Sequence, residues 1–231
     1  MLKAIDLTKK YGNHTALNQL NLTVNEGEIF ALLGQNGAGK TTTINCFLGF
    51  IKPTSGQALV GDASVATSPA LSKKYLAYIP ETVMLYPHLT GLQNLKFFSS
   101  LAGFQYSKED LIYFLKKVGL QDDAHQKSTK GYSKGMRQKV GIAIALSKKA
   151  KALLLDEPTS GLDPKAANEF SNILIELAQQ KTAILMATHD IFRAKEIAHQ
   201  IGILNAGNLV SQVEAASLTA LELEELYLQT V

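Results

Sequence analysis

Cysteine is almost absent from this sequence of 231 residues, in which Cys46 is the single example. One thiol cannot form an internal disulfide, and it excludes a metal site built from several cysteines. Cys46 lies in a segment that reads as helix. We therefore expect it to act as a small, buried, apolar residue.

Long apolar runs are missing as well. No stretch approaches the roughly 20 apolar residues that a membrane-spanning helix needs. Asp6 and its polar neighbours interrupt the N-terminus before a secretory signal could form, and no lipid-anchor motif is present. These absences predict a chain that is soluble by itself and lies in the cytoplasm.

Dense charge of one sign is also lacking. The formal net charge is +3, and basic residues occur only as scattered single residues or short pairs such as Lys73-Lys74. A nucleic-acid groove usually needs a more concentrated basic surface, so we expect no nucleic-acid partner. The hydrophobic content of 46% is ordinary for a globular protein and sufficient for a core.

Short apolar runs alternate with helical segments along most of the chain. Two strands within residues 2–24, joined by a turn at Tyr11-Gly12-Asn13, predict an N-terminal antiparallel β subdomain. Further strands are predicted at 29–33, 57–60, 75–79, 152–155, 182–187, 201–204 and 209–213, and helices at 41–50, 69–74 and 133–147, with others from 163 and from about 217. The alternation favours an α/β fold with a mostly parallel sheet covered by helices.

A block of helical character interrupts this alternation. Thr90 and Gln93 have the spacing of a capping box at its start, and apolar residues recur at helical spacing further on. We expect residues 1–231 to form one domain with two lobes. Residues 90–149 would form an α-helical lobe, residues 1–89 and 150–231 the core lobe, and residues 217–231 a C-terminal helix.

The motif that organises the chain lies between the strand at 29–33 and the next helix. Its residues are Gly34, Gln35, Asn36, Gly37, Ala38, Gly39, Lys40, Thr41 and Thr42. Gly-x-x-x-x-Gly-Lys-Thr in this context is typical of a phosphate-binding P-loop, whose backbone N–H groups and helix N-terminus surround an anion. Lys40 can reach the β- and γ-phosphates, and Thr41 can ligate Mg²⁺. The sequence therefore predicts a nucleoside triphosphate site with Mg²⁺.

A carboxylate pair supplies the second half of this chemistry. The apolar run 152–155 ends in Asp156 and Glu157. A carboxylate at the end of a buried strand lies beside the phosphates, so Asp156 can hold Mg²⁺ directly or through water. Glu157 is then within reach of a water aligned on the γ-phosphate. Acidic residues after a strand also serve as helix caps, which is the alternative.

Three further motifs carry a family resemblance. They are Tyr132-Ser133-Lys134-Gly135-Met136-Arg137-Gln138-Lys139, Pro158-Thr159-Ser160-Gly161-Leu162-Asp163 and Thr188-His189-Asp190. In this order after the P-loop, they resemble the signature motif, the D-loop and the switch histidine of ABC-transporter ATPases. The resemblance covers essentially the whole chain. It implies the ABC ATPase fold, with a P-loop NTPase core and an α-helical subdomain, and ATP as the nucleotide.

The resemblance also implies roles for nucleotide-binding residues. Tyr11 would stack on adenine, the alternative being a turn tyrosine that only packs. Ser133 and Gly135 would contact the γ-phosphate bound to the opposite subunit. Asp163 would shape the dimer seam, a role compatible with capping the helix that follows.

Catalysis, by the same resemblance, would use Lys40, Glu157 and His189. Lys40 would stabilise charge, Glu157 would polarise the attacking water, and His189 would hydrogen-bond the γ-phosphate while holding Glu157 in place. The other histidines have no partner recognisable from the sequence, and we expect them at the surface: His14, His88, His125 and His199.

Two positions depart from the family pattern. The signature is usually Leu-Ser-Gly-Gly-Gln, and here Lys134 and Met136 replace the first glycine and the glutamine. Lys134 can add charge to the phosphate contact. Glu81 stands where the family usually has a glutamine that touches Mg²⁺ and signals to the membrane subunit. A carboxylate can ligate Mg²⁺, but when ionised it cannot donate a hydrogen bond.

The resemblance implies an ATP-hydrolysing subunit of an exporter-like ABC transporter. It would work as a homodimer or heterodimer around two Mg-ATP and sit at the cytoplasmic face of the membrane through a separate membrane subunit. A non-transport ABC ATPase is the alternative, although such proteins usually carry two cassettes or long insertions. A switch GTPase is excluded because no Asn-Lys-x-Asp motif is present.

The docking surface for the membrane subunit is expected at residues 81–88 and the helix from Thr90. Apolar side chains gather there between Pro80 and Pro87, which disfavour a continuous helix. An exposed apolar loop suits a partner helix. The alternative is that Met84 and Leu85 fold back into the protein's own core.

Overall fold

The computed structural model describes residues 1–231, which divide into two compact units. Unit 1 comprises Met1–Tyr78, Lys151–Glu157 and Ile175–Val231. Unit 2 comprises Ile79–Ala150 and Pro158–Leu174. Unit 2 thus holds the predicted helical block together with the segments at 79–89 and 158–174. Gln138 of the block bonds Glu81, Lys139 pairs with Glu169, and Ser160 bonds Glu81 and so links the two segments.

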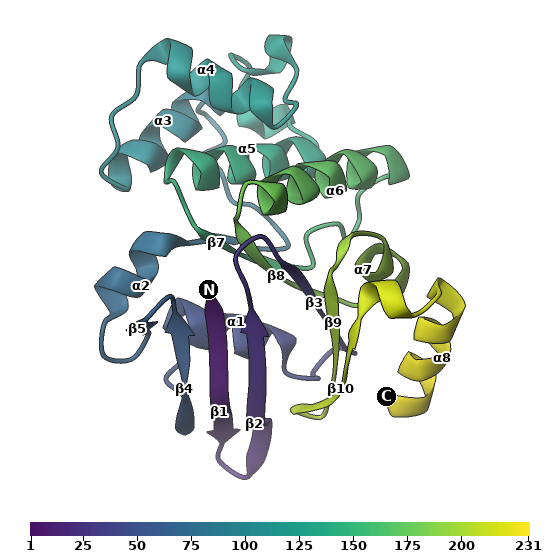
Figure 1. Ribbon diagram of the computed structural model, residues 1–231. Helices are drawn as coiled ribbons and strands as arrows, with labels where there is room; N and C mark the ends of the chain where they lie inside the picture. The colour runs from purple at the N-terminus through teal and green to yellow at the C-terminus, as the bar shows by residue number, and fades with distance from the viewer. The chain divides into compact units, whose positions relative to one another are not determined.

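A four-stranded antiparallel sheet forms the first layer of unit 1. Its strand order is β2-β1-β4-β5, with bounds β1 Leu2–Tyr11, β2 His14–Val24, β4 Ser55–Val60 and β5 Ala63–Ser64. Figure 1 shows β4, β1 and β2 side by side, with the β1–β2 hairpin closing at the turn expected from the sequence. The N-terminal antiparallel β subdomain is confirmed.

A six-stranded sheet is the second layer of unit 1. Its order is β10-β9-β3-β8-β7-β6, with bounds β3 Ile29–Leu33, β6 Leu76–Ile79, β7 Ala152–Asp156, β8 Ala183–Thr188, β9 Gln200–Asn205 and β10 Asn208–Glu214. Strand β3 runs parallel to β8 and β9, and β7 runs parallel to β8. Every residue of β3, β7 and β8 is buried. Burial on both faces explains why these strands read as continuous apolar runs rather than alternating ones.

The register of this sheet determines where the functional motifs meet. Leu33 at the end of β3 pairs with Thr188 at the end of β8. Asp156 at the end of β7 pairs with Ala187. The carboxyl ends of three neighbouring strands therefore lie at one edge of the sheet, where ligands of open α/β folds bind.

Four α-helices lie wholly in unit 1: α1 Lys40–Leu48, α2 Pro69–Tyr75, α7 Ile191–Ile197 and α8 Ala220–Thr230, with the short 3₁₀ turn η3 at Ala215–Ser217. Ile44 and Phe47 of α1 are fully buried in a core shared with strands of both sheets. This packing fixes α1, and with it the loop that precedes it. The C-terminal helix α8 begins after Thr219, which forms a capping box with Glu222.

Unit 2 is helical. Its elements are α3 Gly91–Leu101, α4 Lys108–Lys117, η1 Asp122–Ala124, η2 Thr129–Gly131 and α5 Lys134–Ser147, and it also holds the first part of α6 Pro164–Gln179. Helices α3, α4 and α5 pack against one another. The predicted capping box of Thr90 and Gln93 is present at the start of α3. None of the helices combines the length and apolar character needed to cross a membrane.

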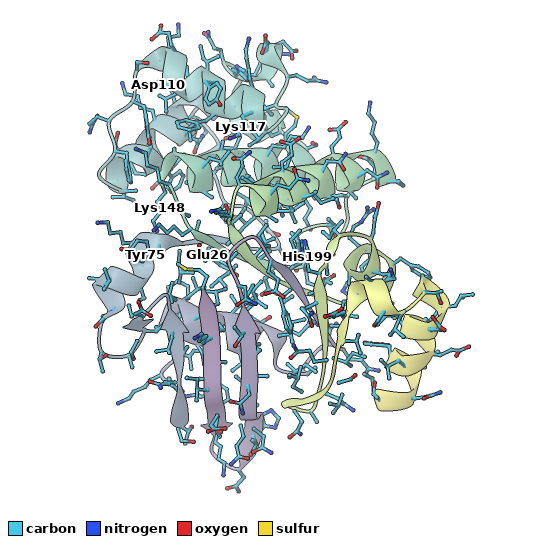
Figure 2. The ribbon with its side chains drawn as sticks, viewed as in Figure 1. Glu26, Tyr75, Asp110, Lys117, Lys148 and His199 are labelled. Carbon is cyan, nitrogen blue, oxygen red and sulfur yellow. The ribbon has the colours of Figure 1, made fainter.

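Helix α4 shows how local sequence sets helix ends in this unit. Ser107 caps it and forms a capping box with Asp110, while Lys117 ends it. Figure 2 shows Asp110 and Lys117 at its two ends. The acidic start and the basic end complement the helix dipole, an arrangement worth about 0.3–1 kcal/mol per charge at exposed sites.

Candidate functional site

The P-loop connects the end of β3 to α1. Gly39 is the N-cap of α1 and has a φ of +113°, and a Cβ added there would lie 2.6 Å from the backbone oxygen of Ala16. Gly37 has a φ of +86°, and a Cβ there would meet nothing within 4 Å. Glycine is required at position 39 by both the positive φ and the lack of space for a Cβ. At position 37 it is required by the positive φ alone. The loop at Gly37 therefore borders open space.

The N-terminus of α1 lacks a side-chain cap, unlike those of α3, α4, α5, α7 and α8. Thr43 N–H bonds the backbone oxygen of Gly39 at 2.9 Å and is the first intrahelical donor. The N–H groups of residues 40–42 have no carbonyl within the helix to bond. Together with the helix dipole they suit an anion, which would take the place of the missing cap.

Lys40 places its ammonium at the centre of the P-loop. Its Nζ donates to the backbone oxygens of Gly34 at 2.5 Å and Gln35 at 3.2 Å, and lies 3.5 Å from Oε1 of Glu157. The side chain is only 6% exposed. A buried ammonium needs such partners because desolvation of an unpaired charge is costly. The cation is thus held beside the loop where phosphates would bind.

Thr41 and Asp156 bring two hard oxygen ligands together. Thr41 Oγ1 donates to Oδ2 of Asp156 at 3.0 Å, across the gap between α1 and the end of β7. The pKa of the nearby Tyr78 phenol is raised, mainly by burial and to a smaller extent by the negative charge of Asp156. A hydroxyl and a carboxylate at this distance are the donor set with which proteins bind Mg²⁺ beside phosphates.

Glu157 has a positive φ, and its two carboxylate oxygens have different partners. Its φ is +45°, a left-handed conformation that few non-glycine residues adopt. Oε2 accepts hydrogen bonds from Thr188 Oγ1 at 3.2 Å and His189 N–H at 3.3 Å, and lies 2.9 Å from His189 Nδ1. Oε1 is buried and has no hydrogen-bond donor. Oε2 is therefore held by Thr188 and His189, whereas the nearest charged group to Oε1 is the Lys40 ammonium at 3.5 Å.

His189 stands just beyond the end of β8, and its side chain is 60% exposed. Asp190, which follows it, caps α7 by accepting from Arg193 N–H. The imidazole thus contacts Glu157 on one side and faces solvent on the other. The structure brings together the three residues predicted as catalytic, Lys40, Glu157 and His189, within unit 1.

Tyr11 ends β1 and is half exposed. The Lys9 ammonium lies 4.8 Å from the centroid of its ring, within cation–π range. An aromatic ring that remains half exposed is not a packing residue of the core. It retains accessible surface on which a base could stack.

The predicted signature residues meet in unit 2. Ser133 is the N-cap of α5, and its Oγ accepts from Met136 N–H at 3.2 Å. Asp163 Oδ1 accepts from Ala166 N–H at 2.9 Å in the first turn of α6, so the expected capping role is present. Ser133, Gly135 and Asp163 all line one pocket of about 310 Å³. Unit 2 therefore gathers these three residues around a common opening.

Glu81 lies in the same unit, against the first turn of α5. Its Oε1 is 3.6 Å from Lys134 Nζ and accepts from Ser160 Oγ at 3.4 Å. The amide of Gln138 donates to the backbone oxygens of Pro80 at 3.3 Å and Glu81 at 3.1 Å. The metal role predicted for Glu81 stays a prediction, since its partners in the structure are Lys134 and Ser160.

One histidine contradicts the expectation from the sequence. His125 is only 4% exposed, and its Nε2 lies 2.9 Å from the backbone oxygen of Leu120. The prediction of a surface position was wrong because the 3₁₀ turn η1 folds the ring inward to meet this carbonyl. The other three histidines are exposed.

The apolar loop at 81–88 is divided between core and surface. Val83 is buried, whereas Met84 is 79% and Tyr86 50% exposed. The amide of Asn94, itself fully buried, accepts from Tyr86 N–H at 2.8 Å and donates to Tyr86 O at 3.1 Å. The alternative that Met84 belongs to the core is therefore wrong, and the loop is held by its backbone.

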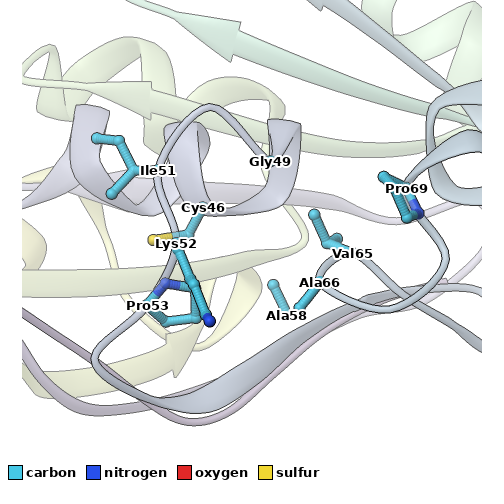
Figure 3. Close-up of a pocket in the computed structure, with 9 residues that line it drawn as sticks. All are labelled: Cys46, Gly49, Ile51, Lys52, Pro53, Ala58, Val65, Ala66 and Pro69. Atoms are coloured by element: carbon cyan, nitrogen blue, oxygen red, sulfur yellow. The ribbon is translucent and has the colours of Figure 1, made fainter.

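Cys46 is buried, as expected, on the core side of α1. It lines a pocket of unit 1, about 280 Å³ in volume, whose other residues come from the end of α1 and from segments 51–58 and 65–69 (Figure 3). Burial raises the pKa of its thiol to about 11. The thiol is therefore protonated at neutral pH and is not a nucleophile.

Sequence reasoning missed the residues that hold the site residues in place. Thr188, Ser160 and Gln138 were quoted within motifs but received no role. Each acts through a tertiary contact to Glu157 or to the Glu81 loop. Of these three residues, only Thr188 had a signal in the sequence, because it lies at a strand end next to the switch histidine.

A fold with a P-loop at the carboxyl edge of a parallel sheet, a strand-end carboxylate pair and a separate helical unit defines a P-loop nucleotide-binding protein. Comparisons with known proteins define the class further. Residues 17–160 match the family described as "ABC transporter".

Relatives and solved structures agree with this match. The bacitracin transport ATP-binding protein BcrA of Bacillus licheniformis is 35% identical over 214 residues, which is 92% of this chain and 69% of BcrA. The solved ATP-binding subunit of an ABC transporter superimposes with a TM-score of 0.87 at 29% identity, over 100% of this chain and 99% of that one. The dimeric ATP-binding cassette MJ0796, in a post-hydrolysis state with ADP and Pi, gives 0.82 at 25% identity, over 93% and 99%.

The chain belongs to the ABC transporter family, as an ATP-binding subunit. The predicted ABC ATPase fold is confirmed.

Proposed function

We propose that this chain hydrolyses ATP with Mg²⁺ and that two such subunits close around two Mg-ATP to drive a separate membrane subunit of an export-type transporter. The observation that supports hydrolysis is the difference between the two carboxylate oxygens of Glu157. One of its oxygens is fixed by Thr188 and His189, and the other is buried beside Lys40 without a donor. Such an arrangement is suited to a general base.

The residues present fit Mg-ATP. The uncapped first turn of α1 and the open space at Gly37 suit the phosphates. Thr41 Oγ1 and the carboxylate of Asp156 would hold the metal. Bound Mg²⁺ would neutralise charge that develops on the phosphate oxygens. Tyr11 would stack on the adenine ring.

Each catalytic residue of the chain has a separate task. Lys40 would pair with the β- and γ-phosphates and stabilise their negative charge. Glu157 Oε1 would accept the proton of a water aligned on the γ-phosphate. His189 would hold Oε2 of that carboxylate through Nδ1 and present its other ring nitrogen to the γ-phosphate.

A second copy would complete the site. Ser133, Gly135 and Asp163 line a pocket of unit 2 and are not part of the network around Lys40 in unit 1. The similar cassette MJ0796 is dimeric in its post-hydrolysis structure. We infer that units 1 and 2 are the two lobes of one ATPase domain, and that unit 2 contacts the nucleotide carried by the other subunit.

The membrane subunit would dock on residues 81–88 of unit 2. Met84 presents an exposed apolar side chain from a backbone that Asn94 fixes. The similar protein BcrA is a bacitracin transport ATP-binding protein, which supports an export-type role. This docking would place the chain at the cytoplasmic face of the membrane.

The direct test is ATP hydrolysis by the purified chain with and without Mg²⁺. Glu157→Gln should reduce turnover by about 10²–10⁴-fold, since the base is lost while the charge clamp remains. ATP binding should persist. Glu176→Gln, at an exposed position of α6, is the matched control and should keep the parental rate. A Glu157→Gln chain with parental turnover would show that the base has been misassigned.

A further inference from the structure

Two residues that depart from the family pattern lie together in unit 2. Lys134 replaces the first glycine of the signature, and Glu81 replaces the usual glutamine. Lys134 Nζ is 3.6 Å from Glu81 Oε1, and Ser160 Oγ donates to the same oxygen at 3.4 Å. The two departures therefore compensate each other's charge. This Glu81–Lys134 ion pair would not exist in a chain that followed the usual pattern at either position.

The backbone on both sides of the ion pair is fixed. Gln138 lies one helical turn after Lys134 on α5 and is fully buried, and its amide group bonds the backbone oxygens of Pro80 and Glu81. The amino end of the 81–88 loop is thus tied to α5 whether or not the ion pair is formed. Breaking the ion pair requires only side-chain rotation.

The ion pair itself is open to exchange. The side chain of Lys134 is 27% exposed and that of Glu81 is 56% exposed. Exposed ion pairs are weak, because water competes for both partners and two long side chains lose freedom. An anion of higher charge that reached Lys134 would therefore displace the carboxylate.

Such an anion is available at this position. Lys134 stands between Ser133 and Gly135, the residues proposed to contact the γ-phosphate on the second copy. A triphosphate carries more charge than a carboxylate, and it would arrive with its own hydrogen-bond partners at the N-terminus of α5.

We propose that Lys134 exchanges anions during the ATPase cycle: it pairs with Glu81 in the separate subunit and with the γ-phosphate of the second copy in the closed dimer. Glu81 then opposes closure of the dimer, because the Glu81–Lys134 ion pair must break before Lys134 can bind the γ-phosphate. Lys134 contributes to ATP-driven dimerisation, and Glu81 opposes it only through Lys134. This inference rests on the proposed function.

The test is a double-mutant cycle on dimerisation, measured by sedimentation of the Glu157→Gln chain with ATP and EDTA. EDTA removes any contribution of Glu81 to metal binding. Glu81→Gln should lower the dimer dissociation constant by about two- to fivefold, the range of an exposed ion pair. Lys134→Gln should raise it. With Lys134→Gln already in place, adding Glu81→Gln should change nothing.

Lys130→Gln, which removes an exposed lysine from the neighbouring η2, is the matched control and should leave dimerisation unchanged. A Glu81→Gln effect of the same size with and without Lys134 would overturn the exchange, as would a weaker dimer in Glu81→Gln alone. A parent that stays monomeric with ATP both in EDTA and in Mg²⁺ would overturn the proposed function together with this inference. If the parent dimerises but the effects of Glu81→Gln and Lys134→Gln simply add in the double variant, this inference alone would be overturned.

Discussion

Two lysine–glutamate pairs of nearly equal length occupy the two units of this molecule. The Lys40–Glu157 pair in unit 1 spans 3.5 Å, with side chains 6% and 14% exposed. The Glu81–Lys134 pair in unit 2 spans 3.6 Å, with Lys134 27% and Glu81 56% exposed. Equal distance does not mean equal strength, because water screens the second pair far more than the first. The first pair is suited to fixed geometry and the second to exchange.

The N-terminus of α1 in unit 1 also differs from that of α5 in unit 2. α1 has no side-chain cap and leaves its first N–H groups to a ligand. α5 is capped by Ser133, whose hydroxyl lines an open pocket. This contrast supports the proposal that unit 1 binds and hydrolyses a nucleotide, whereas unit 2 contacts the nucleotide of a second copy.

The largest expected effect follows from breaking the buried pair. Lys40→Ala should reduce ATP turnover by about 10²–10³-fold or more, since a fixed charge aimed at the phosphates is lost. It should also lower the free energy of unfolding, because Glu157 is left buried without its cation. Steady-state hydrolysis and a denaturant titration measure the two effects. Lys3→Ala, an exposed lysine on β1, should change neither, and parental hydrolysis by Lys40→Ala would refute the role of Lys40.

The next effect concerns the pocket of unit 2. Ser133→Arg should prevent ATP-driven dimerisation of the Glu157→Gln chain, because a long cation fills the position where phosphate would contact α5. The helix also loses its cap, worth about 0.5–2 kcal/mol. Light scattering with and without ATP gives the result, and a thermal melt checks folding. A folded Ser133→Arg chain that dimerises normally would count against the proposed contact.

A smaller effect on the isolated chain is expected from Met84→Glu. This side chain is 79% exposed, so the isolated chain should keep its stability and its ATPase rate. Binding to the membrane subunit should drop, since a charge is placed in an apolar contact. Co-purification with the membrane partner measures this. Retained co-purification would move the docking surface elsewhere, and an unfolded variant would contradict the exposed position of Met84.

The smallest functional effect is expected at Cys46. Because burial raises its pKa to about 11, alkylation of the native chain at pH 8 should be slower than that of the urea-unfolded chain by about 100-fold from ionisation alone. The rate should rise with pH, since the folded pKa lies above the ordinary value. Cys46→Ala should keep parental hydrolysis. Fast labelling of the native chain at pH 8 would contradict the burial.

The sequence could predict features that depend on neighbouring residues. The P-loop, the strand ending at Asp156 and the capping box of Thr90 and Gln93 are local patterns, in which neighbouring residues determine their own conformation. Their elements are where the sequence placed them. The strand order that brings Thr188 beside Glu157 needed the register of the sheet.

Contacts between distant residues could not be predicted. The sequence showed Glu81 and Lys134 as two separate departures, because nothing local says that one side chain meets the other. His125 was misplaced for the same reason, since its burial depends on the carbonyl of Leu120 and the fold of η1.

The central claim is that unit 2 of one chain acts on the nucleotide held by unit 1 of another. The most direct test mixes two inactive variants, Lys40→Ala and Ser133→Arg, in equal amounts. In the mixed dimer, the intact P-loop of the Ser133→Arg chain faces the intact signature of the Lys40→Ala chain. The account predicts that single-turnover ATP hydrolysis returns in the mixture, while each variant alone stays inactive. A mixture as inactive as its components would contradict it.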